Sequence, residues 1–210
     1  MNFLFNLSHR KKLLFFILSI LCGFLDYLIC DLVAWVNHLP LFCDTIFIMA
    51  LSFFAGPWWG ALAGFFYHLI DFALHHTMEL GHLFILCHFL AALTAGYFKI
   101  LFIKKSDSRF LLFVKLNILV IVLCLVMSVS GGIISYILNN IEAYNKASSQ
   151  TDFLTFLWQN KFNSKLLLQI AVRIPVNIAD RFICTFAAWG VYLAAKKLTD
   201  LINYKSCSSS

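Results

Sequence analysis

Long apolar runs separated by short polar turns make up most of the chain. Such runs, of about 17 to 25 residues, match the length that a helix needs to cross a hydrocarbon core of about 30 Å. The pattern predicts helices at 13–36, 39–55, 57–74, 81–103, 110–138 and 175–198. The run at 39–55 is the weakest candidate for a span, because about 17 residues rising about 1.5 Å each cover only about 25 Å. The short alternating segments of a membrane β-barrel are absent.

The stretch from 139 to 174 is the one long polar insertion. It opens with NNIEAYNKASSQTD and continues with FLTFLWQNKFNSKLLLQIAVRI, in which apolar residues recur at helical spacing. We expect an interfacial helix here, either as a lid over an outward cavity or as a connector on the membrane surface. The sequence thus predicts an all-α integral membrane protein with six transmembrane helices, forming a single domain over residues 1–210.

Composition excludes an ordinary soluble domain, since 61% of the 210 residues are hydrophobic and only 12% are charged. The apolar run that follows SHRKK continues without a small-residue cleavage site, so we interpret it as a retained first helix. The seven cysteines show no paired or metal-type spacing, which indicates packing thiols. The net charge of +6 comes from basic residues beside helix ends, which favours topology signals over nucleic-acid binding.

These basic residues predict the orientation, because Lys and Arg near helix ends are retained in the cytoplasm. The basic residues form three clusters. One precedes the first helix, one surrounds the turn near 104–109 and one follows the last helix. An even number of helices with both termini inside satisfies all three clusters. We therefore expect a multi-pass protein of the bacterial cytoplasmic membrane with cytoplasmic termini.

Several polar residues, most of them ionisable, interrupt the apolar runs near the predicted outer ends of the helices. They are Asp26, Asp31, Asp44, His68, Asp71, Asn177, Asp180 and Arg181. A charge at the bilayer centre costs about 2.5–3.5 kcal/mol or more, so several at one depth favour a shared polar cavity. Interhelical salt bridges, with Arg173 or Arg181 facing an aspartate, remain the alternative.

Three glycines, Gly56, Gly60 and Gly64, recur every four residues around the start of the third helix. Pro57 stands at the favoured first position of that helix. The spacing places the glycines on one helix face, which predicts close packing against another helix. Trp58 and Trp59 are expected at the cytoplasmic interface.

Two segments, LPLFCDTIFIMALSFFAGPWWGALAGFFYHLI and RIPVNIADRFICTFAAWGVYLAAKK, resemble the substrate-binding S component of energy-coupling factor (ECF) transporters. The shared motifs are the Asp-Thr start of the second helix, the Gly-Pro-Trp junction, the spaced glycines and the Asp-Arg pair. His68 departs from the pattern, since relatives often carry asparagine there.

The resemblance implies a protein that captures a vitamin-like micronutrient from outside and works with a transmembrane coupling subunit and two ATPase subunits. Those ATPases must be other chains, because no GxxxxGK[ST] phosphate loop occurs here. In the family, small residues four apart in the first helix contact the coupling subunit. Ser19 and Gly23 have this spacing, although internal packing would explain them equally well. We expect neither catalysis nor a cofactor in this chain.

The solute is expected in the outer half, between the ends of the first, third and sixth predicted helices and beneath the 139–174 insertion. The residues predicted to bind it are Trp35, Asp71, Trp158, Asn177, Asp180 and Arg181. The aromatic residues would form walls and the polar residues would pair with the solute.

Two other functions compete with solute capture. A six-helix membrane ligand sensor would want a signalling domain, but only TDLINYKSCSSS follows the last predicted helix. A transition-metal uptake protein would use the His-rich outer loop, where His75, His76, Glu79 and His82 lie within eight residues. Solvated histidines are the simpler interpretation of that loop, and no metal site is expected there.

The predicted topology can be tested by cysteine labelling of whole cells. An impermeant reagent should modify Ser148→Cys, which lies in the predicted outer loop, and should spare Ser106→Cys in the predicted cytoplasmic turn. The reverse pattern would overturn the orientation and the outward cavity with it.

Overall fold

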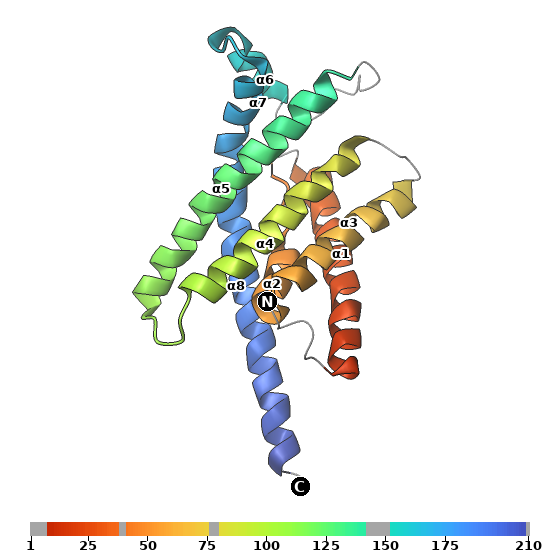
Figure 1. The fold of residues 1–210 in the computed structure, drawn as a ribbon, viewed down its shortest axis with the longest axis vertical. Helices are drawn as coiled ribbons and strands as arrows, with labels where there is room; N and C mark the ends of the chain where they lie inside the picture. The colour runs from red at the N-terminus through yellow and green to blue at the C-terminus, as the bar shows by residue number, and fades with distance from the viewer. Residues whose placement is uncertain (1–7, 38–40, 76–79, 142–151, 209–210) are drawn as a thin grey trace.

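The computed structural model describes residues 8–37, 41–75, 80–141 and 152–208, and within them the regular structure is helical, without strands. The elements are α1 (His9–Asn37), α2 (Ile46–Ala55), α3 (Pro57–His75), the 3₁₀ helix η1 (Leu80–Phe84), α4 (Ile85–Phe102), α5 (Arg109–Asn139), α6 (Asp152–Trp158), the 3₁₀ helix η2 (Gln159–Lys161), α7 (Lys165–Ala171) and α8 (Arg173–Ser208) (Figure 1). The predicted all-α class is confirmed.

Three helical segments are long and apolar enough to cross a membrane, as judged over the described residues. They are His9–Val33, Gly81–Phe102 and Arg109–Asn139. Large apolar side chains cover their outward surfaces; Leu13 of α1 and Ile121 of α5, for example, are 61% and 60% exposed. Such exposed apolar surfaces, on helices of this length, indicate a membrane protein.

Helix α2 lies at the centre of the bundle, and it is shorter than predicted. It has ten residues and begins at Ile46, whereas the sequence predicted a helix over 39–55. Ten residues span about 15 Å, too little to cross a membrane. Ile48, Met49 and Phe53 are 1% exposed or less, because α1, α3, α4 and α8 all pack around this short helix.

Residues 41–45 are not helical because their backbone amides bond to side chains of other helices. Cys43 has a positive φ of 49°, which a helix does not allow. Carboxylates from α1 and α8 accept the hydrogen bonds of this stretch and of the first turn of α2. Hydropathy alone could not reveal these long-range partners.

The close packing predicted for the glycines around the α2–α3 junction is confirmed for Gly60 and Gly64, whereas Gly56 lies outside α3 and ends α2. Gly56 ends α2 with a φ of 112°, in the left-handed region that favours glycine. A Cβ on Gly60 would lie 2.7 Å from the carbonyl oxygen of Ile48 in α2, and one on Gly64 would lie 2.9 Å from Cβ of His88 in α4. The predicted start of α3 at Pro57 is confirmed.

Ser19 and Gly23 lie between α1 and α3. Ser19 is fully buried, and its Oγ lies 2.8 Å from the carbonyl oxygen of Phe15 and 3.1 Å from that of Trp59. A Cβ on Gly23 would lie 2.6 Å from the carbonyl oxygen of Ala63. In this structure both residues therefore contact α3. They could contact a coupling subunit, as expected from the sequence, only if α1 moved away from α3. That contact stays a prediction.

The turn between α4 and α5 has its own polar network. Asp107 accepts hydrogen bonds from the Lys104 backbone N–H at 2.8 Å and from Lys115 Nζ at 2.6 Å. These donors, with the Lys115 bond the stronger cause, lower the pKa of the Asp107 carboxyl below its usual value. Ser108 caps α5 by accepting from the Leu111 N–H.

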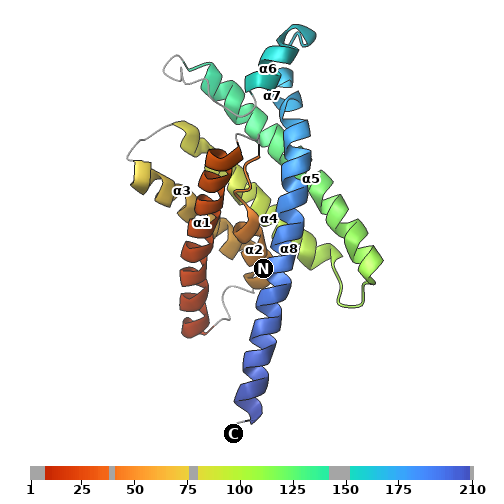
Figure 2. The ribbon, with the colours of Figure 1, turned by 180° about the vertical axis from the view of Figure 1, so that it is seen from behind.

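The long polar insertion contains α6, η2 and α7, with residues 142–151 outside the described part. A Cβ on Gly132 of α5 would lie 2.6 Å from Cγ1 of Ile170, so α7 packs closely on α5. Both views show α6 and α7 beside the end of α5 and beyond the start of α8 (Figures 1 and 2). The two roles predicted for the insertion, a lid over an outward cavity and a connector on the membrane surface, both stay predictions.

The tight approach of α1 to α3 predicts that Gly23→Ala destabilises the protein by about 1–3 kcal/mol, since the new methyl group would meet backbone atoms that cannot rotate away. Thermal unfolding of the purified protein in detergent measures the change. Gly190→Ala is the matched control, because a Cβ there meets nothing within 4 Å and alanine favours the helix. Equal stability of the two variants would contradict the described α1–α3 packing.

Candidate functional site

Arg181 of α8 is the centre of a buried polar network. Its side chain is 1% exposed, and its guanidinium donates to Thr45 Oγ1 at 2.6 Å and to Asp44 Oδ1 at 3.1 Å. It also donates to Oδ2 of its neighbour Asp180. Two carboxylates and a hydroxyl therefore share one cation in the protein interior, where an unpaired charge would be costly.

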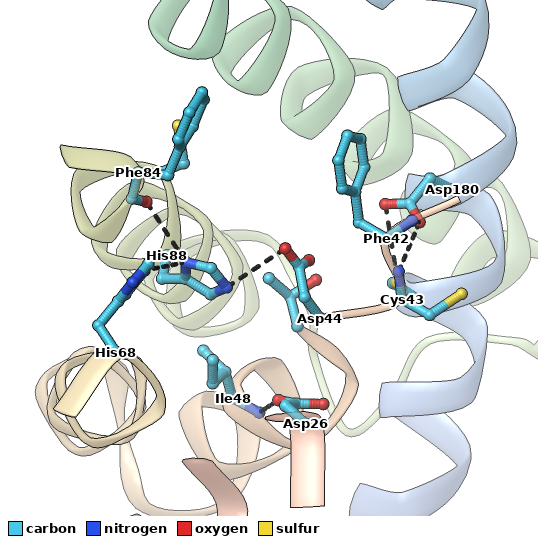
Figure 3. Close-up of polar contacts among 12 residues, drawn as sticks. Asp26, Phe42, Cys43, Asp44, Ile48, His68, Phe84, His88 and Asp180 are labelled. Carbon is cyan, nitrogen blue, oxygen red and sulfur yellow. Dashed lines mark hydrogen bonds and ion pairs between the residues drawn. The ribbon is translucent and has the colours of Figure 1, made fainter. Parts of the chain in front are cut away.

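Asp180 joins α8 to the irregular segment before α2. Its Oδ1 accepts hydrogen bonds from the backbone N–H groups of Phe42 at 2.9 Å and Cys43 at 2.8 Å (Figure 3). With Oδ2 on Arg181, both oxygens of this fully buried carboxylate have partners. Asp180 therefore holds the 41–45 segment on α8.

Asp26 of α1 stabilises the start of α2 from outside that helix. Its oxygens accept from the N–H groups of Phe47 at 3.0 Å and Ile48 at 2.7 Å (Figure 3). These are free donors of the first turn, which an N-cap side chain usually satisfies. Thr45 is the N-cap residue but makes no capping bond, because its hydroxyl faces Arg181.

Two histidines extend the network from Asp44 toward α3. His88 of α4 places Nε2 3.4 Å from Asp44 Oδ2, and its Nδ1 lies 3.0 Å from Nε2 of His68 (Figure 3). Tyr67 stacks on the His88 ring with centroids 4.5 Å apart. A continuous series of polar groups thus connects Asp180 on α8 to His68 on α3.

The series ends in a cluster of His68, Asp71 and His82. One potential metal-binding atom of each lies within 4.8 Å of those of the other two. His82 Nδ1 lies 3.8 Å from Asp71 Oδ2, and these side chains are 29% and 34% exposed. His68 itself is 9% exposed, and its Nδ1 is a buried atom with no hydrogen-bond partner. The cluster therefore connects the partly exposed end of α3 to the buried network.

A second group of possible ligands, Cys43, Asp180 and Cys184, also lies close together. All three residues are buried, and both oxygens of Asp180 are already used by backbone N–H groups and by Arg181. The adjacent guanidinium would repel a cation. This group therefore serves the fold rather than a metal.

The other predicted solute-binding residues are spread over the molecule. Asn177 is buried on α8 and donates to Ser128 Oγ of α5 at 2.9 Å. Trp158 ends α6 and stacks on Phe162, with centroids 6.2 Å apart. Trp35 lies in α1, but its side chain is outside the described ones. The structure thus places Asp180 with Arg181 in the buried part of the network, and Asp71 with His82 at its partly exposed end.

The His-rich loop is described only in part. His76 and Glu79 lie outside the described residues, as does the side chain of His75 at the end of α3. His82 lies in η1 and faces Asp71. The sequence grouped His82 with His75, His76 and Glu79 as candidate metal ligands, whereas the described contact of His82 is with Asp71 of α3.

Sequence reasoning missed His88 and Thr45, which carry the connections between the predicted polar residues. His88 is 3% exposed in the middle of the core. It could have been found, since an ionisable residue within an apolar run of membrane-spanning length usually faces a polar partner. Thr45 entered the sequence analysis only through the Asp-Thr motif, and its contact with Arg181 could not be foreseen because threonine is common at helix starts.

A separate cavity of about 400 Å³ lies at the opposite end of the bundle, where α2 turns into α3. It is lined by Ser52, Phe53, Phe54, Ala55, Gly56, Pro57, Trp58, Trp59, Tyr97, Lys99 and Ile100. Lys99 Nζ donates to the carbonyl oxygen of Phe53 and lies 4.3 Å from the centroid of the Tyr192 ring. Lys99, the one basic residue in this lining, therefore already has partners within the protein.

Comparison with protein-family models, with curated proteins and with solved structures found no match.

The buried network predicts that Arg181→Leu lowers the free energy of unfolding by about 3–5 kcal/mol, because Asp44 and Asp180 would lose their shared cation. Unfolding in detergent measures it. Lys197→Leu also replaces a cationic side chain by leucine, at an exposed position of the same helix, and should change stability by no more than about 0.5 kcal/mol. A stable Arg181→Leu protein would show that the carboxylates do not depend on this cation.

The two groups of acidic residues should also respond differently to neutralisation. Asp180→Asn replaces an acceptor of Arg181 by an amide and should destabilise the protein by several kcal/mol. Asp71→Asn changes a partly exposed residue and should leave stability within about 1 kcal/mol. The comparison is made by thermal unfolding of both variants, and a larger loss for Asp71→Asn would contradict the division into two groups.

Proposed function

We propose that this chain is the solute-capturing S subunit of an ECF-type importer in a bacterial cytoplasmic membrane. One observation carries the proposal: ionisable side chains of α3, α4 and α8, together with Asp44 before α2, form a connected series inside an apolar bundle, and Asp26 of α1 binds the start of α2 beside it. Such groups are expensive to bury among membrane helices and typically mark a solute or ion pathway. The sequence motifs described above point to the same class of protein.

In this proposal α1, α3, α4, α5 and α8 cross the membrane, and the irregular segment 41–45 together with the short α2 makes the sixth crossing, which ends at the α2–α3 junction. Both termini lie in the cytoplasm, as the basic clusters indicate. The cluster of His68, Asp71 and His82 then lies toward the outside, where α3 ends. The α2–α3 junction with its cavity lies toward the cytoplasm, where partner subunits would dock.

The buried network suggests a division of labour within the proposed site. Asp26, Asp180 and Arg181 use their hydrogen bonds to hold α1, α8 and the start of α2 together. Asp71 and His82 are partly exposed, and they are the groups that a solute could reach without disrupting the fold. We therefore place the first contact of the solute at the end of α3.

The partner prediction can be tested by affinity purification of the tagged chain from its native membranes. We expect a transmembrane coupling protein and two ATPase subunits with GxxxxGK[ST] loops to copurify, because this chain lacks a nucleotide site. Mass spectrometry identifies the proteins. Copurification of a kinase or cyclase without ATPases would instead favour the ligand sensor and overturn the proposal.

Native mass spectrometry of the same preparation should reveal a small molecule bound to the chain. A solute pocket that closes on its ligand should retain it through purification when dissociation is slow. The mass would name the solute class.

A further inference from the structure

We propose that His68, Asp71 and His82 bind a divalent transition-metal ion. The inference rests on the proposed function and makes the captured solute a metal ion. Two imidazoles and a carboxylate are the ligand types that suit Zn²⁺ and its neighbours Co²⁺ and Ni²⁺. Three protein ligands with one open position are typical of sites from which the metal must also exchange or react.

The distances in the cluster fit such an ion. Metal–ligand bonds of about 2.0–2.2 Å at tetrahedral angles separate two ligand atoms by about 3.3–3.6 Å. His82 Nδ1 and Asp71 Oδ2 are 3.8 Å apart, and the potential ligand atoms of all three residues lie within 4.8 Å of one another. The first pair needs to approach by about 0.2–0.5 Å, and the other pairs by up to about 1.5 Å, which side-chain rotation can supply.

The unpartnered ring nitrogen of His68 is the second observation that points to a ligand. His68 is 9% exposed, and a buried nitrogen without a partner costs free energy unless something pairs with it. His68 lies three residues before Asp71 on α3, so the two side chains share a helix face. A metal ion bound to Nδ1 of His68 would supply the missing partner.

The residues behind His68 are arranged as the outer support of a metal ligand. Metal-bound histidines usually donate their second N–H to an acceptor, which fixes the ring and its tautomer. A metal ion on Nδ1 of His68 would leave the proton of that ring on Nε2, which would donate to Nδ1 of His88 at 3.0 Å. In that tautomer His88 carries its proton on Nε2, 3.4 Å from Asp44 Oδ2, and its Nδ1 does not donate to the Phe84 carbonyl oxygen 3.3 Å away. Arg181 in turn fixes Asp44, so the buried network supports the proposed site.

The exposure of the cluster suits a site that loads from solvent. His82 and Asp71 are 29% and 34% exposed, whereas His68 and His88 are buried. Solvent can therefore reach two ligands while the third stays rigid. The three ligands come from two elements, because His82 lies in the short helix η1 whereas His68 and Asp71 lie in α3.

The test uses the full chain, purified in detergent through a tag without histidines and stripped with a chelator. Titration with Co²⁺, followed by visible absorption, should show one equivalent bound per chain, and Zn²⁺ should displace it. His82→Gln and Asp71→Asn should each weaken Co²⁺ binding at least about tenfold, since even outer-sphere partners of metal ligands contribute that much. His9→Gln, which changes an exposed histidine at the start of α1, should bind as the unaltered chain does.

His68→Gln should lose binding as well, and thermal unfolding of that variant shows whether it is folded. Absence of stoichiometric Co²⁺ binding, or unchanged binding in both His82→Gln and Asp71→Asn, would overturn the proposal. Loss of binding only in His75→Gln or His76→Gln would also overturn it, because the metal would then belong to the loop.

The outcome is independent of the importer proposal, since the titration needs no partner subunit. Copurified ATPases with an organic solute and no Co²⁺ binding would overturn the metal site and keep the importer. Stoichiometric metal binding lost in the cluster variants, in a chain that recruits no ATPase, would keep the site and overturn the importer.

Discussion

The burial of one guanidinium between two carboxylates organises this protein. Arg181 links α8 to Asp44 and Thr45, and its neighbour Asp180 holds the backbone before α2. A buried ion pair adds little net stability compared with apolar packing, but it is costly to break because the remaining charge has no partner. The pairing therefore specifies one arrangement of α8 against the centre of the bundle. The same residues border the start of α2 and face His88, because Thr45 is the N-cap of α2 and Asp44 lies 3.4 Å from His88.

An acidic side chain from another helix binds the free N–H groups at the start of α2, which a residue next to the helix usually binds. The first turn of α2 is capped by Asp26 from α1, while its own N-cap residue serves the guanidinium. A membrane interior has no water to satisfy free N–H groups, so every irregular segment needs such partners. Aspartates in apolar helices can thus have a structural role as well as a functional one.

Much of the fold could be predicted from the sequence, because apolar runs of the right length report directly on helices. The ends of α1, α3 and α5 lie within four residues of the predictions. Helix α2 was predicted too long because hydropathy contains no information about the side chains that bind the backbone of residues 41–45. The predicted convergence of polar residues was correct for Asp44, Asp180 and Arg181. Asp71 lies at the partly exposed end of the network beside His82 of η1, a contact between two elements that spacing alone could not assign.

Hydrogen–deuterium exchange with and without Co²⁺ tests in one measurement whether a stable buried network supports a metal-binding cluster at the end of α3. We expect slow exchange over residues 42–48 in both conditions, because carboxylates hold those amides, and slower exchange over 80–88 only when Co²⁺ is present. Rapid exchange over 42–48 without metal, or a response to Co²⁺ confined to that segment, would contradict this expectation.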